Sequence, residues 1–261
     1  MKIVSLVSAV NQNIEELVKG ICLETDAVVV NQCETDDSGS LDVNNHKVYW
    51  RKMNARGVGL SRNTCIEMTP ECDIALFTDE DITYDEGYSK LILDEFMKHP
   101  EADVLLFNVR VCDARRTYWN DEFGKINMFN YGRYPAYSIA IRHNKLKESA
   151  IKFPLEFGGG AKYINGEDSV FLHDCLEAGL HIYKTPVCIG EEAERESTWF
   201  SGYNDRFFIS RGALYVRLYG KLALFRAYVF LLRHRYMFKE CGFGRAIRLM
   251  KQGMKEIRNA K

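Results

Sequence analysis

Hydrophobic positions follow two alternating patterns over roughly the first 180 residues. Short runs that are almost wholly apolar and rich in β-branched residues are typical of strands buried on both faces of a sheet. Between these runs, apolar residues recur at helical spacing, as at Ile14, Leu17 and Ile21. The predicted strands are residues 2–10, 26–32, 47–53, 73–78, 102–111 and 137–142, and the predicted helices are residues 13–24, 61–68, 88–99 and 167–178.

This alternation predicts an α/β fold with a sheet flanked by helices on both faces. Ligands of such sheets bind at the carboxyl ends of the strands. In "DIALFTDEDITYDEG", the predicted strand runs directly into Asp79, Glu80 and Asp81. Carboxylates this close repel one another, so either water solvates them or a positive charge lies among them. The acidic cluster therefore lies where a binding site is expected.

Composition narrows the class of protein. A chain of 261 residues with 46% hydrophobic residues can bury a full core, as one large domain or as a domain with an appendage. The eight cysteines form no CxxC pair, which predicts reduced thiols and a cytoplasmic protein. The apolar run at the amino terminus is too short for a signal peptide and is interpreted as a strand.

The net charge of −1 conceals an uneven distribution. Residues 211–261 contain 13 Lys and Arg against two acidic residues, whereas residues 1–210 contain 22 basic and 34 acidic residues. Such an asymmetry predicts that the two regions meet different surroundings.

Four motifs occur in order across residues 7–171: "VSAVNQN", "NARGVGLSRN", "TDED" and "NGEDSVF". Through them the chain resembles the glycosyltransferases of family 2, which act by inversion. The resemblance implies the GT-A fold, a Rossmann-like mixed sheet flanked by helices. It places the catalytic domain at residues 1–195, with a nucleotide-sugar half at about 1–85 and an acceptor half at about 86–195. Residues 196–261 then form a basic, aromatic-rich helical region.

The resemblance assigns the acidic cluster to the donor and its metal. It makes Asp81 the direct ligand of Mg²⁺ or Mn²⁺, and puts Asp79 nearer the ribose or the outer shell of the metal. Glu80 joins the donor-binding residues. A divalent cation stabilises the charge that grows on a leaving diphosphate, and these hard ions prefer oxygen ligands. The alternative is a solvated acidic turn or a helix cap.

The segment "GGGAKYINGEDSVF" provides candidates for acceptor binding and catalysis. The glycines can bend around an acceptor, and the resemblance makes Asp168 the general base, with Glu167 orienting the acceptor. A carboxylate within hydrogen-bond reach can take the proton of an attacking hydroxyl. The alternative is that Asp168 or Glu167 merely caps the helix. The acceptor-binding candidates are Gly158, Gly159 and Gly160.

Other donor-binding candidates follow the first and third predicted strands. By resemblance they are Ala9, Asn11, Arg62 and Asn63. A cation at Arg62 suits a diphosphate, and the alternative is a structural salt bridge with the loop of the second strand.

The second strand departs from the family. Relatives have an Asp-Asp-Gly-Ser turn whose first Asp pairs with uracil, whereas this chain has Asn31 and Gln32 there. An amide offers both a donor and an acceptor to a pyrimidine edge. A UDP-sugar donor is favoured and a dTDP-sugar stays open.

The carboxyl-terminal third is apolar, aromatic and basic together. In "LYGKLALFRAYVFLLRHRY" we predict a helical stripe that is too short and too charged to span a bilayer. One interpretation is that the stripe packs on the catalytic domain or on a partner subunit, so that a homodimer is one alternative. The other is that it lies on an anionic membrane surface. Nucleic-acid binding is disfavoured because no recognisable module is present. The stripe consists of Leu218, Leu222, Phe225, Val229 and Leu232.

The sequence as a whole predicts a metal-dependent inverting glycosyltransferase of bacterial-type surface-polysaccharide synthesis. It would move a sugar from a nucleoside-diphosphate donor to a hydroxyl of a glycan or lipid-diphosphate-linked glycan, in the cytoplasm and at the inner face of the membrane. A nucleotidyltransferase would need a Gly-rich basic loop after the first strand, which "VSAVNQNIEE" lacks. A non-catalytic sugar-binding or scaffold relative would tolerate changes at Asp81 and Asp168.

Overall fold

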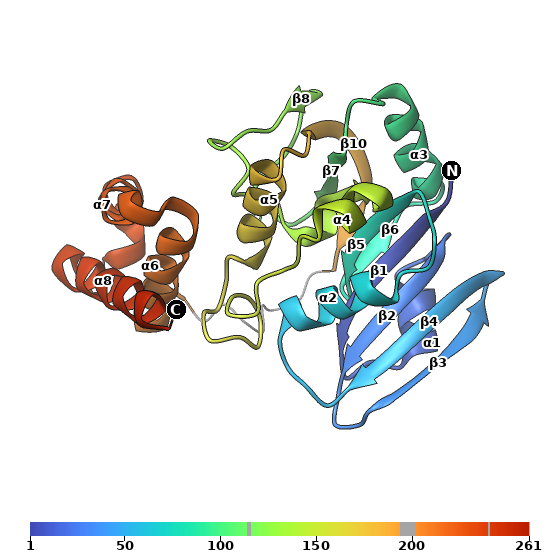
Figure 1. Cartoon of the computed structure of the whole chain (residues 1–261), viewed down its shortest axis with the longest axis horizontal. Helices are drawn as coiled ribbons and strands as arrows, with labels where there is room; N and C mark the ends of the chain where they lie inside the picture. Colours follow the sequence, from blue (N-terminus) through green and yellow to red (C-terminus); the bar gives the residue numbers. More distant parts are fainter. Residues whose placement is uncertain (114–115, 194–201, 240, 261) are drawn as a thin grey trace.

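The computed structural model describes residues 1–113, 116–193, 202–239 and 241–260. A ten-stranded mixed sheet forms its centre, with the strand order β3-β4-β2-β1-β5-β9-β7-β10-β6 and β8 beside β10 (Figure 1). The pairs β1–β2, β1–β5, β2–β4 and β7–β10 are parallel. The strands are β1 Ile3–Val10, β2 Asp26–Gln32, β3 Asp37–Val43, β4 His46–Met53, β5 Ile74–Asp79, β6 Ile82–Tyr84, β7 Val104–Arg110, β8 Gly124–Lys125, β9 Ile139–Arg142 and β10 Ile182–Glu192.

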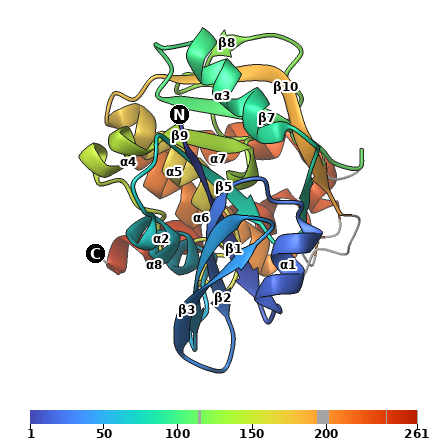
Figure 2. The same cartoon turned by 90° about the vertical axis from the view of Figure 1, so that its right-hand side faces the viewer.

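Helices cover both faces of the sheet, which confirms the predicted fold class. Apolar residues of α1 and α3 pack on one face, and those of α2, α4 and α5 pack on the other (Figure 2). Strand β1 contributes to both, because its successive side chains alternate: Val7 faces α1 and Leu6 faces α2. The helices are α1 Ile14–Gly20, α2 Val58–Met68, α3 Tyr88–Lys98, α4 His143–Ser149, α5 Glu167–Glu177, α6 Asp205–Tyr219, α7 Ala223–Arg233 and α8 Phe243–Asn259.

All six predicted strands are present, and four further strands were not predicted. Strand β3 is mostly exposed and carries the polar sequence DSGSLDV, so it lacks the apolar run that marks a buried strand. It pairs with β4 through a hairpin whose turn residues Asn44 and Asn45 have φ of 51° and 65°. Asn tolerates this left-handed conformation better than most residues, which suits it to a tight hairpin.

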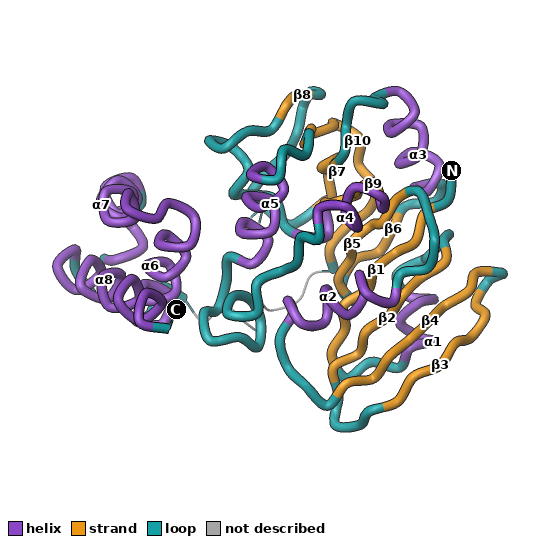
Figure 3. The backbone as a smooth tube through the Cα atoms, viewed as in Figure 1, coloured by secondary structure: helices purple, strands orange, loops and turns teal. Residues whose placement is uncertain are grey.

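Beyond the sheet, the described part of the carboxyl-terminal region is helical (Figure 3). Helices α6 and α8 approach so closely that a Cβ at Gly212 would lie 2.0 Å from the carbonyl oxygen of Met250. A Cβ at Gly253 would lie 1.9 Å from the carbonyl oxygen of Ile209. The two glycines therefore permit this helix pair, and larger residues there would force it apart.

The carboxyl-terminal helical region docks on the sheet-containing part of the chain through α5. Leu214 of α6 packs against Gly166, where a Cβ would lie 2.7 Å from the leucine side chain. The backbone N–H of Ile164 donates to the hydroxyl of Ser210 over 3.1 Å, and Arg217 pairs with Asp174 of α5. Helix α6 thus contacts α5, which carries the acidic pair, both at its start and along its length.

The predicted apolar stripe is interrupted. Helix α6 ends at Tyr219, a 3₁₀ turn occupies Gly220–Leu222, and α7 starts at Ala223. Leu218 packs against the core, whereas Leu222 and Phe225 are 64% and 65% exposed. Among the described residues, none of the helices combines the length and the hydropathy that crossing a bilayer requires.

Candidate functional site

Arg62 joins three parts of the chain at the carboxyl end of β5. Its side chain projects from α2 and is almost fully buried, with 4% of its surface exposed. One terminal nitrogen donates to both carboxylate oxygens of Asp79 over 2.8 and 3.1 Å. The other donates to Asp168 over 2.8 Å and lies 3.6 Å from the carboxylate of Glu167. The acidic strand end and the acidic helix start thus share one cation.

The charges of this cluster are mutually dependent. Burial by itself lowers the pKa of Arg62, but the negative charges of Asp79, Asp168 and Glu167 outweigh burial and raise that pKa well above its usual range. The guanidinium also stacks on the ring of Phe153, 5.2 Å from its centroid. Arg62 therefore stays charged, and it is the positive charge that the acidic cluster requires.

The two acids at the start of α5 hold their protons more tightly than usual. Burial and the neighbouring charge of Asp168 raise the pKa of Glu167 to about 8. Burial also raises the pKa of Asp168, although Arg62 opposes this shift. Asp168 accepts a hydrogen bond from the charged Arg62, which favours its ionised form, so it is the better candidate for a proton acceptor, and Glu167 is the candidate hydrogen-bond donor.

Neither of these acids is the N-cap residue of α5. Gly166 occupies that position with φ of 109°. The carboxylate of Asp168 instead binds Arg62. Its position on the first turn still benefits from the positive end of the helix dipole.

The glycine loop lies against this cluster. A Cβ at Gly158 would come within 2.7 Å of the carboxyl carbon of Glu167, and a Cβ at Gly160 would lie 2.9 Å from the backbone nitrogen of Gly57. The carbonyl of Gly159 accepts a 2.9 Å hydrogen bond from the backbone of Val58. The loop is thus brought to the acidic pair by close backbone packing on the start of α2.

The three acids after β5 have three different surroundings. Asp79 binds Arg62, and the carboxylate of Glu80 accepts a 2.7 Å hydrogen bond from the backbone of Val10. The carbonyl of Asp81 accepts a 2.7 Å hydrogen bond from Ala193. Glu80 and Asp81 also line a cavity of 290 Å³ together with Gln12. Glu80 therefore anchors the end of β1, while Asp81 lies at a cavity.

The carboxylate of Asp81 and the cavity beside it suit a hard divalent cation. The described residues contain no group of three or more His, Cys, Asp or Glu side chains placed to hold a metal ion. Mg²⁺ and Mn²⁺ are, however, commonly held by one or two carboxylates together with phosphate oxygens and water. Asp81 at the 290 Å³ cavity can supply such a carboxylate.

Several predicted donor-binding side chains are bonded to the protein's own backbone. Asn31 accepts from the backbone N–H of Gln12 over 3.1 Å and donates to its carbonyl over 2.7 Å. The Oε1 of Gln32 accepts from Gly57 over 2.7 Å. These amides hold the loops after β1 and β4 in place.

Asn63 makes a similar pair of bonds. It donates to the carbonyl of Phe153 over 2.9 Å and accepts from its N–H over 2.8 Å. Ala9 is buried beside Asn31 in the sheet register, and Asn11 adopts φ of 54° as the chain leaves β1. Ala9, Asn11, Asn31 and Gln32 therefore lie together at the carboxyl ends of β1 and β2.

Two residues near the cluster were not predicted. Tyr137 lies in a 3₁₀ turn before β9, and burial and the nearby carboxylates of Glu192, Asp79 and Asp168 raise its pKa. Arg56 donates a 3.0 Å hydrogen bond to the carbonyl of Gln32. Tyr137 stands outside the four motifs, so the sequence offers no signal for it, whereas Arg56 lies within "NARGVGLSRN" but was not singled out there.

Comparisons with known proteins agree with this architecture. No model of a protein family matches the sequence. No curated protein matches it either. Solved structures do match, and among them is S. aureus TarS 1-349 in complex with UDP-GlcNAc, with a TM-score of 0.66 and 16% identity over 98% of this chain and 82% of that one.

Two further structures are similar. The structure of S. aureus TarS gives a TM-score of 0.60 with 17% identity, covering 92% of this chain and 44% of that one. The mannosyltransferase PcManGT from Pyrobaculum calidifontis, in complex with GDP-Man and Mn²⁺, gives a TM-score of 0.51 with 14% identity, covering 99% of this chain and 75% of that one. At such identities the likeness shows a shared fold, and it confirms the fold predicted from the sequence.

Proposed function

We propose that this protein is a glycosyltransferase that moves a sugar from a nucleoside-diphosphate donor to a hydroxyl of a glycan acceptor. The observation that carries the proposal is the bridge from Asp79 through Arg62 to Asp168. This bridge connects the end of β5, where a nucleotide donor would bind, to the carboxylate that would act as the general base. The fold is shared with structures that hold UDP-GlcNAc and GDP-Man, which supports a nucleotide-sugar donor.

In this reaction Asp168 is the general base. The oxygen of the acceptor hydroxyl bonds to the anomeric carbon as the bond from that carbon to the diphosphate breaks, and the hydroxyl proton passes to Asp168. Attack opposite the leaving diphosphate inverts the anomeric configuration. Arg62 holds the carboxylate of Asp168 in one orientation through its 2.8 Å hydrogen bond. Glu167, whose pKa is raised to about 8 by burial and by the charge of Asp168, would donate a hydrogen bond that orients the acceptor.

The donor would lie at the ends of β1, β2 and β5. Mg²⁺ or Mn²⁺, when bound, would neutralise charge on the diphosphate as a Lewis acid. Asp81 would hold the ion. The loops that are held in place by Asn31 and Gln32 would contact the nucleobase of the donor. We propose a UDP-sugar, supported by the fold shared with the UDP-GlcNAc complex, and a dTDP-sugar is the second candidate.

We also propose that α7 lies on an anionic membrane surface at the cytoplasmic face, where a lipid-diphosphate-linked acceptor would be found. Leu222, Phe225 and Leu232 are each more than half exposed. Exposed basic residues flank them, among them Lys221 and Arg233. Apolar side chains with cations beside them complement the acyl chains and anionic headgroups of a bilayer.

A screen of nucleotide sugars tests the proposed function. Each UDP-, dTDP- and GDP-sugar is incubated with the protein and Mn²⁺ or Mg²⁺, and slow hydrolysis of the donor and the shift in melting temperature are measured. One nucleotide sugar is expected to be hydrolysed and to stabilise the fold by mass action. If no nucleotide sugar is hydrolysed or raises the melting temperature with either ion, the proposal is wrong.

A further inference from the structure

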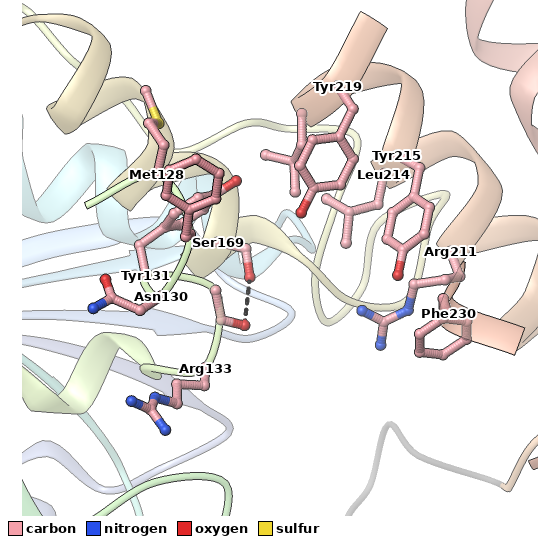
Figure 4. Close-up of a pocket in the computed structure, with 13 residues that line it drawn as sticks. Met128, Asn130, Tyr131, Arg133, Ser169, Arg211, Leu214, Tyr215, Tyr219 and Phe230 are labelled. Carbon is pink, nitrogen blue, oxygen red and sulfur yellow. Dashed lines mark hydrogen bonds between the residues drawn. The ribbon is translucent and has the colours of Figure 1, made fainter. Parts of the chain in front are cut away.

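A second cavity lies beside the start of α5, on its side toward α6. Its volume is 430 Å³, and its walls come from residues 128–133 and from α6, with Ser169 of α5 between them (Figure 4). The hydroxyl of Ser169 donates a 3.4 Å hydrogen bond to the carbonyl of Gly132. Because Ser169 directly follows Asp168 on the first turn of α5, the cavity lies one residue along this helix from the proposed base. A molecule in this cavity would therefore be on the acceptor side of the site.

The lining of this cavity is basic. It includes Arg133 and Arg211, and no Asp or Glu is among the described residues that line it. This is unusual in a part of the chain where other arginines are paired: Arg62 binds Asp79 and Asp168, and Arg217 binds Asp174.

Arg211 is the clearest exception. Within the described part of the chain it forms no ion pair, and its buried Nε has no hydrogen-bond partner. Its guanidinium is held between the rings of Phe207 and Phe230, 5.3 Å from each centroid. A desolvated cation without a counter-ion is costly, because it loses hydration and gains no hydrogen bonds in return. An anion in the cavity would compensate that cost.

The walls also offer hydroxyl and aromatic groups. Tyr215 and Tyr219 project into the cavity from α6, on the same side as Arg211, while Asn130 and Arg133 lie across from them (Figure 4). Arg226 stacks over the ring of Tyr219, 4.5 Å from its centroid, and lies 3.4 Å from its hydroxyl. Such a cavity can hydrogen-bond an anion from two sides while a ring packs on the sugar that carries it.

We infer that this cavity binds a phosphate group carried by the acceptor, so that the acceptor is a phosphorylated glycan. The inference rests on the proposed function, because it assigns the chemistry of the acceptor that Asp168 would activate. A phosphate is favoured over a carboxylate because donors lie on both walls of the cavity, and the tetrahedral phosphate presents acceptor oxygens in more directions than a planar carboxylate.

Phosphate binding is tested directly with the full chain. Calorimetry measures the affinity for glycerol 3-phosphate, with glycerol as the uncharged comparison and with UDP and Mn²⁺ present to fill the donor site. Arg133→Gln and Arg211→Gln are each expected to weaken binding by about tenfold or more, since each removes a charge-assisted hydrogen bond. Arg248→Gln changes the charge equally at an exposed position of α8 and is expected to leave the affinity unchanged. Arg133 is exposed, so its replacement does not threaten folding.

A second arm distinguishes the source of the phosphate. The same variants are measured with a polyprenyl-diphosphate-linked sugar in detergent micelles. If only the affinity for glycerol 3-phosphate depends on Arg133 and Arg211, the cavity takes a soluble phosphate. If only the affinity for the polyprenyl-linked sugar depends on them, it takes a lipid-linked phosphate. Either outcome supports the inference. If both variants bind both probes as the unaltered protein does, or if glycerol binds as well as glycerol 3-phosphate, the inference is overturned.

The outcome is separable from that of the proposed function. Slow donor hydrolysis requires no acceptor, so it is measured separately in the unaltered protein and in the control Arg248→Gln, which are expected to hydrolyse the nucleotide sugar at the same rate. Absence of hydrolysis in the unaltered protein would remove the proposed function, while calorimetry would still report whether the cavity binds phosphate.

Discussion

The guanidinium of Arg62 donates a 2.8 Å hydrogen bond to the carboxylate of Asp168, although the two residues lie 106 positions apart. The same group binds Asp79 at the end of β5. One buried cation therefore holds the proposed donor side and the proposed base in a fixed relation. A change in Arg62 is expected to alter stability and catalysis together.

Replacing this cation tests its structural importance. Arg62→Met keeps much of the apolar volume but leaves the surrounding carboxylates without compensation. We expect the free energy of unfolding to fall by about 3–5 kcal/mol, the range for breaking a buried ion pair. Urea denaturation measures it.

Arg110→Met is the matched control, because Arg110 pairs with Asp85 over 2.6 Å but both side chains are substantially exposed. It is expected to cost less than about 1 kcal/mol. Equal losses in the two variants would mean that the Arg62 bridge contributes no more than a surface pair.

The metal proposal predicts the behaviour of Asp81→Asn. The amide keeps the shape of the side chain but loses the charge that attracts a divalent ion, so metal-dependent affinity for the nucleotide sugar is expected to fall by about tenfold or more. Calorimetry with and without Mn²⁺ measures it, and Asp94→Asn on the exposed face of α3 is the control. Full transfer in excess EDTA would contradict metal dependence.

The proposed base predicts a different pattern for Asp168→Asn. An amide cannot take a proton, so transfer is expected to fall by about 10²–10⁴-fold, the usual contribution of general-base catalysis. Donor affinity is expected to persist, because the proposed nucleotide-sugar site lies at the other end of the bridge. Turnover with an acceptor and calorimetry with the donor separate the two effects. A loss of donor affinity with unchanged turnover would assign Asp168 to the nucleotide site.

The raised pKa of Glu167 predicts a dependence of stability on pH. Between its ordinary value of 4.5 and about 8, the folded protein holds a proton that the unfolded chain has released. This contribution is therefore complete below the ordinary pKa and is lost as the pH rises through that window, by up to about 1.4 kcal/mol per pH unit.

Glu167→Gln is neutral at every pH and is expected to remove this slope. Free energies of unfolding at pH 5, 6, 7 and 8 measure it, with the exposed Glu148→Gln as control. Parallel profiles for Glu167→Gln and the unaltered protein would show that Glu167 is ionised throughout.

The exposed face of α7 predicts binding to anionic vesicles. Phe225→Ser together with Leu232→Ser is expected to abolish sedimentation with vesicles of phosphatidylglycerol, and added salt is expected to weaken binding of the unaltered protein by screening. Leu91→Ser with Met97→Ser removes exposed apolar side chains from α3 instead and serves as the control.

Substitution is preferable to truncation here, because α6 packs on α5 and on α8 through Gly166 and Gly212. If the unaltered protein ignores the vesicles but elutes as a dimer that the α7 variant disrupts, a second copy of the chain covers this face.

Much of the sheet could be predicted from the sequence, because strands β1, β2 and β5 are buried on both faces and their apolar runs record that burial locally. The order of the motifs likewise predicted the fold that the structural comparisons confirm. The acidic pair at the start of α5 and the acids after β5 were recognised for the same reason, since they stand at the ends of clear periodic segments.

Only the tertiary structure decided which charges meet. From the sequence, the expected partner of Arg62 was a diphosphate or the loop of the second strand. In the structure its side chain binds Asp79 and Asp168. The fold also brought Arg133 and Arg211 to opposite walls of one cavity. Hydrophobic periodicity is a local property that each segment carries by itself, but the partner of a charge depends on which distant segments come within a few ångströms. That proximity is produced by packing of the whole chain, and no short stretch of sequence contains it.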